Sequence, residues 1–231
     1  MADIFEKAAY LNDEVMMSGT GKYIVIEGND GTGKSTQVAM LADYFRARGR
    51  VVCVVEEPGS NDPEKSTPVA NELRRIVKNG NLVRSSEINL ALFSAARREL
   101  WREKIQPALQ RGEIVLSARN YISTLAYQGY GDGLDTEEIM RMTKLFTDER
   151  YLQPDAMIIL MLSDTQRQQR IAERGHIAHP DTFESREQSF QDRVNHAYEA
   201  IAAEQNIPVL SAAGAPEEVH ARILDSIARY L

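Results

Sequence analysis

A short segment, GNDGTGKS at residues 28–35, constrains the fold of this chain more than any other feature of its sequence. It matches the pattern G-x-x-x-x-G-K-[ST], follows an apolar run at residues 23–27 and opens an amphipathic segment at residues 34–48. A glycine-rich loop between a strand and a helix binds phosphate, because its backbone N–H groups turn inward and the helix N-terminus adds a positive end. The motif therefore predicts binding of a nucleoside triphosphate.

Individual residues of this loop have separate predicted roles. The Lys34 ammonium group is predicted to reach the β- and γ-phosphates, and the Ser35 hydroxyl group to bind Mg²⁺. The alternative is an ordinary glycine-rich turn, but average residue usage gives such a match in only about one chain in a hundred of this length. The predicted ATP-binding residues are Gly28, Asn29, Asp30, Gly31, Thr32, Gly33, Lys34, Ser35 and Thr36.

Short apolar runs alternate with longer amphipathic segments along the rest of the chain. The predicted strands are residues 23–27, 51–55, 114–117, 156–162 and 208–210. The predicted helices are residues 34–48, 68–78, 86–111, 136–149, 164–174, 183–204 and 216–230. This alternation predicts an α/β fold of three layers, with a five-stranded parallel sheet flanked by helices. We expect a single domain over residues 21–231, with a small lid at about 175–185 and an N-terminal extension over residues 1–20.

Composition and charge exclude several classes of partner. The net charge of −7 argues against broad nucleic-acid binding, which needs Lys and Arg to neutralise phosphates, although a local pocket can still be basic. No run approaches the ~18 apolar residues that a membrane-spanning helix needs, and the N-terminus has no secretory signal pattern. The single Cys53 cannot form an intramolecular disulfide. We therefore expect no nucleic-acid or membrane partner and a cytoplasmic location.

The phosphate-binding loop alone does not identify the group that receives the phosphate, since GTPases and motor ATPases share it. A GTPase would need the guanine-reading tetrapeptide N-K-x-D, which the sequence does not contain. An ABC-type or motor ATPase would normally be larger or carry partner-binding modules. A P-loop kinase that acts on a nucleotide or a small metabolite fits the chain better.

Several stretches resemble the thymidylate kinase family in order and spacing. Residues 57–59 (EPG) resemble its turn after the second strand, and residues 92–97 (LFSAAR) its thymine-reading helix. Residues 123–129 (STLAYQG) resemble the segment after its third strand, and residues 183–184 its lid. The resemblance covers nearly the whole chain after the extension. It implies phosphorylation of dTMP to dTDP by ATP with Mg²⁺, carried out by a homodimer.

The resemblance also implies roles for single residues in the acceptor site. Phe93 and Arg97 share one helical face, and they correspond to a Phe that stacks on thymine and an Arg that hydrogen-bonds a base carbonyl. The alternatives are a core position for Phe93 and a solvated helix charge for Arg97. Asp30 is expected near the 3′-hydroxyl group and Arg119 at the acceptor phosphate. The predicted acceptor-binding residues are Asp30, Glu57, Arg74, Phe93, Arg97, Arg119, Ser123, Tyr127, Gln128 and Glu184.

Phosphoryl transfer needs positive charge near the transferred group. Some thymidylate kinases place a catalytic Arg in the P-loop, where this chain has Gly31, and others supply it from the lid. Arg170 and Arg174 lie four residues apart before the lid, so one helical face presents both. The alternative is a solvated basic face that they share with Arg167. The predicted catalytic residues are Lys34, Arg119, Arg170 and Arg174.

The chain departs from the family pattern at four positions, and each change removes favourable charge. Ala118 replaces the Asp that is associated with Mg²⁺, and Glu56 replaces an Arg before the EPG turn. Thr182 replaces an Arg of the lid, and Met161 replaces an Asp of the fourth strand. Mg²⁺ can still be held by phosphates, the P-loop hydroxyl and water, and Glu57 is a candidate for part of the lost role.

These departures leave two alternatives to a dTMP kinase. One is a kinase of the same fold with another nucleotide or a nucleoside as acceptor, because the altered positions lie at the phosphate end. The other is a weakly active or non-enzymatic nucleotide-binding relative. The intact Gly33, Lys34 and Ser35 argue against the second alternative.

Overall fold

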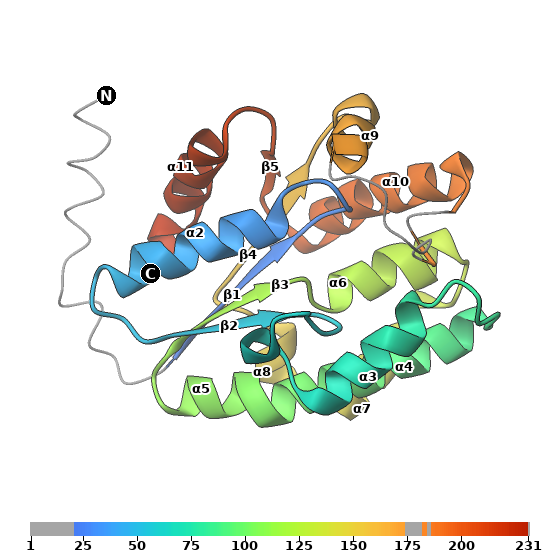
Figure 1. Ribbon diagram of the computed structural model, residues 1–231, viewed down its shortest axis with the longest axis horizontal. Coiled ribbons are helices and arrows are strands. Elements are labelled where there is room, and N and C mark those ends of the chain that lie inside the picture. The colour runs from blue at the N-terminus through green and yellow to red at the C-terminus, as the bar shows by residue number, and fades with distance from the viewer. Residues whose placement is uncertain (1–20, 174–181, 184–185, 231) are drawn as a thin grey trace.

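The computed structural model describes residues 21–173, 182–183 and 186–230, and a parallel five-stranded sheet forms its framework (Figure 1). The strands are β1 (Lys22–Glu27), β2 (Val52–Glu56), β3 (Ile114–Ala118), β4 (Ala156–Met161) and β5 (Val209–Ser211). They lie in the order β2-β3-β1-β4-β5, and every neighbouring pair is parallel. The predicted fold class is confirmed. Because all strands run the same way, their carboxyl ends meet at one edge, where α/β proteins bind ligands.

Helices cover both faces of the sheet (Figure 1). On one face, α2 (Lys34–Arg46) and α11 (Pro216–Ile227) pack with alternate strand residues such as Ile24. On the other face, the intervening residues such as Tyr23 pack with several helices. In the central strands β1 and β3, the side chains on both faces are buried, so these strands read as nearly continuous apolar runs. The helices of the second face include α3 (Pro68–Lys78), α4 (Ser86–Leu100), α5 (Gln106–Gln110), α7 (Thr136–Phe146) and α10 (Gln188–Gln205).

The structure differs from the prediction at several helix boundaries. The helix predicted over residues 86–111 is continuous, but a π-helical segment, η3 (Trp101–Ile105), separates α4 from α5. The helix predicted over residues 136–149 ends at Phe146, because the Asp148 side chain caps a new helix by accepting the N–H of Tyr151 at 3.2 Å. That helix is α8 (Glu149–Leu152).

Two helical segments after β3 were not predicted. They are α6 (Tyr121–Thr124) and the π-helical η4 (Leu125–Gly131), and they carry site residues. In addition, α10 begins at Gln188 instead of residue 183, while α9 (Asp164–Glu173) follows β4 as expected. The short helices η2 (Pro63–Lys65) and η5 (Ala228–Tyr230) complete the fold.

Parts of the prediction fall on residues that the structure does not describe. They are the extension over residues 1–20, most of the lid at about 175–185, and the site candidates Arg174 and Glu184. The assignment of residues 21–231 to a single domain stays a prediction. No helix in the described part of the chain is long and apolar enough to cross a membrane.

Candidate active site

The P-loop runs from the end of β1 into α2, as predicted. Gly28, Gly31 and Gly33 have positive φ angles of 134°, 89° and 87°, which residues other than glycine rarely adopt. A Cβ atom on Gly28 would also lie 2.3 Å from the carbonyl oxygen of Leu160 in β4. The Lys34 ammonium group donates to the carbonyl oxygen of Asn29 at 2.8 Å. The loop therefore has the local geometry of a phosphate cradle.

Glu27, a residue that we did not predict as part of the site, anchors this loop by hydrogen bonds to backbone N–H groups. Its side chain is fully buried at the end of β1. One carboxylate oxygen accepts the N–H of Gly28 at 3.1 Å, and the other accepts the N–H groups of Asn120 at 2.7 Å and Ser123 at 3.1 Å. The hydroxyl group of Tyr198 also donates to it at 3.2 Å. An acid at the end of an otherwise apolar strand was the sequence signal that could have revealed it.

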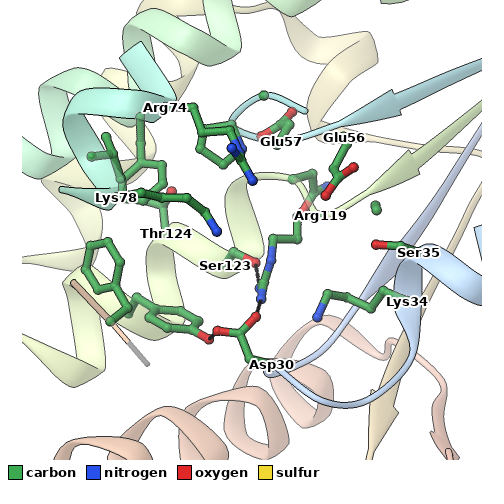
Figure 2. A pocket seen from close by; sticks show the side chains of 18 of the residues that line it. Asp30, Lys34, Ser35, Glu56, Glu57, Arg74, Lys78, Arg119, Ser123 and Thr124 are labelled. Atoms are coloured by element: carbon green, nitrogen blue, oxygen red, sulfur yellow. Dashed lines mark hydrogen bonds and ion pairs between the residues drawn. The ribbon is translucent and has the colours of Figure 1, made fainter. Parts of the chain in front are cut away.

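A cavity at the carboxyl edge of the sheet connects the P-loop with α3, α4 and the segment after β3. Figure 2 shows Arg74 and Lys78 reaching in from α3 and Lys34 reaching in from the P-loop, with Arg119 between them. Lys78 was not predicted. The predicted residues that line this cavity are Asp30, Gly31, Gly33, Lys34, Ser35, Thr36, Glu57, Arg74, Phe93, Arg97, Arg119, Ser123, Tyr127 and Gln128.

Arg119 lies at the centre of the cavity in an unusual backbone conformation. Its φ angle is 78°, a left-handed value that costs about 1–3 kcal/mol in a non-glycine residue. Two hydrogen bonds hold the backbone in this conformation. The N–H of Arg119 donates to the carbonyl oxygen of Ile26 at 3.0 Å, and its carbonyl oxygen accepts from the hydroxyl group of Ser117 at 2.7 Å. The guanidinium group forms a salt bridge with Asp30 and donates to Ser123 at 2.8 Å. Strain at this position serves to aim a cation into the cavity.

The charges in this region determine the protonation state of Asp30. Burial alone would raise the pKa of the Asp30 carboxyl group, but the nearby Arg119 and Lys34 outweigh burial and hold that pKa well below its usual range. The hydroxyl group of Tyr127 also donates to Asp30 at 3.1 Å. Asp30 is therefore ionised at neutral pH and is hydrogen-bonded on the cavity wall.

Arg97 is buried, so the alternative of a solvated helix charge is wrong. Its Nε atom lies 3.2 Å from a carboxylate oxygen of Glu57 and 2.9 Å from the hydroxyl oxygen of Tyr151. One of its terminal nitrogens donates to Thr124 at 2.9 Å. Burial raises the pKa of the Glu57 carboxyl group, and Arg97 and Tyr151 oppose that effect. Arg97 and Glu57 thus form a nearly inaccessible pair in the cavity wall.

Three buried donor groups that belong to lining residues have no hydrogen-bond partner among the described residues. They are Nη1 of Arg97, Nδ2 of Asn120 and Nε2 of Gln128. Buried donors are nearly always paired in folded proteins, so such groups indicate a missing acceptor. This wall of the cavity suits a ligand that presents carbonyl or phosphate oxygens.

Aromatic rings line the same wall. The ring centroids of Phe93 and Phe183 are 5.7 Å apart, and those of Phe183 and Tyr127 are 5.8 Å apart with the rings nearly perpendicular. Phe93 lines the cavity and also packs against the core, and its role in stacking on a base stays a prediction. Flat rings beside buried donors match the faces and the edges of a nucleobase.

Comparisons with known proteins agree with this geometry. The family model described as thymidylate kinase matches residues 26–223. The thymidylate kinase of Gluconobacter oxydans is 35% identical to this chain over 213 residues, which cover 91% of this chain and 96% of that protein. The thymidylate kinase of Rhizorhabdus wittichii is 37% identical over 214 residues, which cover 91% of this chain and 99% of that protein. This chain belongs to the thymidylate kinase family.

A solved structure supports the same assignment. The crystal structure of thymidylate kinase from Ehrlichia chaffeensis matches this chain with a TM-score of 0.69 and 27% sequence identity, and covers 89% of this chain and 98% of that chain. The predicted family is therefore confirmed.

In this member of the thymidylate kinase family, Arg167 and Arg170 lie over the P-loop. Arg167 is buried and packs on Gly31, so the predicted alternative of a solvated face is wrong for Arg167. The guanidinium group of Arg170 lies 3.8 Å from where a Cβ atom on Gly33 would be, and it donates to the carbonyl oxygens of Ala212 at 3.0 Å and Gly214 at 3.4 Å. The catalytic role of Arg170 stays a prediction.

The residues present fit a Mg²⁺ site that relies on the bound nucleotide. Among the residues described, no group of three or more His, Cys, Asp or Glu side chains could hold a metal ion. Ser35 is exposed and lines the cavity together with Glu56 and Ala118. Mg²⁺ is usually held by one or two protein oxygens plus phosphates and water, so the side-chain oxygens of Ser35 and Glu56 are sufficient.

Proposed function

We propose that this member of the thymidylate kinase family transfers the γ-phosphoryl group of ATP to dTMP, giving ADP and dTDP, with Mg²⁺ as cofactor. The observation that carries the proposal is one cavity that joins the P-loop Lys34 to a wall of aromatic rings and unpaired donors. Family membership supports dTMP as the acceptor. The comparisons give no support to the other acceptors that the sequence left open.

Base recognition follows from the wall that Phe93 and Arg97 share. The Phe93 ring offers a face for stacking, and the unpaired nitrogens of Arg97 and Gln128 can donate to carbonyl oxygens of the base. Thymine presents a carbonyl group where cytosine presents an amino group. A fixed N–H donor of the protein therefore rejects cytosine, because it would face the amino group, which is also a donor. Asp30, held by Arg119 and Tyr127, offers an acceptor for the sugar hydroxyl group.

Phosphoryl transfer in this site needs position and charge rather than a side-chain nucleophile. A phosphate oxygen of the acceptor attacks the γ-phosphorus in line, and the bond to the β-phosphate oxygen breaks. The P-loop N–H groups and Lys34 hold the donor phosphates, while Arg74 and Arg119 neutralise the acceptor phosphate. Mg²⁺, held by Ser35, the bound phosphates and water, would neutralise part of the negative charge on the donor nucleotide. Exclusion of water by the lid would limit hydrolysis of ATP.

The test is ADP release in a coupled assay with ATP, Mg²⁺ and one acceptor at a time. The acceptors are dTMP, dUMP, UMP, CMP, dCMP, AMP, GMP and thymidine. We expect turnover that is selective for dTMP, lost in Lys34→Ala and kept in Lys144→Ala, a matched change at an exposed lysine. Selective turnover of another acceptor would overturn the proposed substrate. ATP binding without turnover of any acceptor would overturn the proposed activity.

The homodimer that the resemblance implies and the cytoplasmic location are also part of this proposal. Light scattering coupled to size exclusion would give the mass in solution, for comparison with the chain mass of 26.0 kDa. A mass near 52 kDa, twice the chain mass, is the expected result. A mass near that of one chain would contradict the dimer.

A further inference from the structure

The strand that should carry the metal-binding carboxylate ends in alanine. P-loop proteins commonly hold Mg²⁺ with the P-loop Ser or Thr and with an acid at the end of another strand of the sheet. In this chain β3, the neighbour of β1, ends at Ala118, whose methyl group cannot bind a metal ion. The next strand outward is β2, and it ends at Glu56.

Glu56 and Ala118 occupy the same level of the sheet. Their Cα atoms are partners in the parallel register of β2 and β3, so Glu56 is displaced from Ala118 by one strand and not along the sheet. Ser35, Glu56 and Ala118 line the cavity together, and the same three residues also line a second groove that is formed by residues of α2 and β2. Figure 2 shows the Glu56 carboxylate directed toward the part of the pocket where the Ser35 hydroxyl lies.

A hydrogen-bond network holds the Glu56 carboxylate in this orientation. The hydroxyl group of Ser60 donates to one carboxylate oxygen at 2.9 Å and accepts the N–H of Asp62 at 3.2 Å. Ser60 is buried, and its own N–H donates to the Asn71 side chain of α3 at 3.0 Å. A carboxylate whose hydrogen-bond partner is fixed in this way is oriented before any ligand binds.

The other two carboxylates of the cavity are engaged elsewhere. Glu57, the substitute that we predicted, accepts from Arg97 at 3.2 Å with one oxygen and from Tyr151 at 2.5 Å with the other. Asp30 is paired with Arg119 and Tyr127. An acid at Glu56 without a cation would repel the phosphates that the site collects, and a bound metal ion removes that repulsion.

We propose that Glu56 is the protein carboxylate of the Mg²⁺ site, where it binds the ion directly or through a water molecule that the ion retains. The small Ala118 leaves the space open between the Glu56 carboxylate and the nucleotide side of the cavity. This inference rests on the proposed function, because the remaining ligands come from the bound nucleotide and Ser35. In this chain the carboxylate has therefore moved from β3 to β2.

The test measures metal affinity directly, with Mn²⁺ as the probe and ADP as the nucleotide. Electron paramagnetic resonance of free Mn²⁺ gives the affinity of the full-length chain with ADP bound. We expect Glu56→Gln to weaken Mn²⁺ binding by about tenfold or more. The affinity for ADP in EDTA should fall little or rise, since a negative charge is lost. Glu72→Gln, an exposed change on α3, should leave both affinities unchanged.

A double variant tests whether the metal-binding carboxylate can be moved from β2 back to β3. Glu56→Gln combined with Ala118→Asp returns a carboxylate to β3 at the same register, and we expect it to recover much of the Mn²⁺ affinity. Circular dichroism checks that each variant is folded. Equal Mn²⁺ affinity in Glu56→Gln and the wild type would overturn the inference while leaving the proposed function intact. Failure of the wild type to bind ADP at all would overturn the proposed function and, with it, this inference.

Discussion

Arg97 and Glu57 form an ion pair inside the cavity wall, with the Nε atom 3.2 Å from the carboxylate oxygen and with side chains only 2% and 5% exposed. Tyr151 donates to the same carboxylate and lies 2.9 Å from the same nitrogen. The pair joins α4 to the turn after β2, two elements that also shape the acceptor site. Arg97 therefore serves the stability of the fold as well as the proposed recognition of the base.

Removal of the Arg97 side chain should destabilise the protein strongly. Arg97→Ala leaves the buried Glu57 carboxylate without its counter-ion, and breaking such a pair typically costs about 3–5 kcal/mol. Urea unfolding measures the change in the free energy of unfolding. The matched control is Arg98→Ala, because the Arg98 side chain is exposed on the same helix and its loss should cost less than about 0.5 kcal/mol. Equal stability of the two variants would show that the pair contributes nothing.

Glu27→Gln should loosen the P-loop although the two side chains have the same shape. Both carboxylate oxygens accept backbone N–H groups, one from Gly28 and the other from Asn120 and Ser123. Either orientation of the amide group therefore sets its NH₂ against a backbone donor, at a cost of about 1–3 kcal/mol. Calorimetry should show weaker ADP binding, and thermal unfolding should show a lower Tm. An unchanged affinity for ADP, alongside a lower Tm, would mean that Glu27 supports the fold but does not position the loop.

Asp30 should make the stability of the protein fall at acid pH. Its folded-state pKa is lowered, so the ionised form stabilises the fold at pH values above the unfolded-state pKa of about 3.9. That contribution is lost as the pH falls below about 4 toward the folded-state pKa. The difference in Tm between the wild type and Asp30→Asn should therefore be largest near pH 7 and shrink below pH 4. A difference that stays constant from pH 7 to pH 3 would contradict the prediction.

Local chemistry explains which parts of this protein could be predicted from its sequence. All five strands were predicted to within one residue at each end, because each is a short apolar run bounded by turn or polar residues. The P-loop was predictable because its function depends on backbone geometry that a few glycines encode. The helices after β3 were not predicted, because α6 spans only four residues and η4 carries Gly129 and Gly131, which have low helix propensity.

Contacts between distant residues explain most of what was missed. Arg97 has its partners 40 and 54 residues away in the sequence, so no local pattern shows that it is buried. Glu27 has partners 93 and 171 residues away. The position of Glu56 beside Ala118 depends on strand order, since β2 and β3 are separated by several helices in the chain. Strand order is a property of the whole fold and cannot be predicted from the sequence of any one segment.

Two glycines with similar backbone angles allow strain to be separated from function. Gly31 in the P-loop has a φ angle of 89°, and Gly133 after η4 has a φ angle of 84°. A Cβ atom on Gly31 would lie 3.0 Å from Cγ of Arg167 and 3.1 Å from its carbonyl oxygen, whereas one on Gly133 would meet no described atom within 4 Å. Gly133→Ala therefore tests the backbone strain alone, which is about 1–2 kcal/mol for a left-handed residue.

Gly31→Ala should lower the free energy of unfolding by the same backbone strain, with a small further loss from the contact with Arg167. It should also weaken ADP binding, which Gly133→Ala should not do. The displaced loop would misalign the N–H groups that face the phosphates, so we expect the affinity for ADP to fall by about tenfold, which corresponds to about 1.4 kcal/mol. Urea unfolding and calorimetry on both variants make the comparison. If both variants bind ADP as tightly as the wild type, the contact between Gly31 and Arg167 does not control the shape of the P-loop. If both lose affinity equally, the effect comes from general destabilisation.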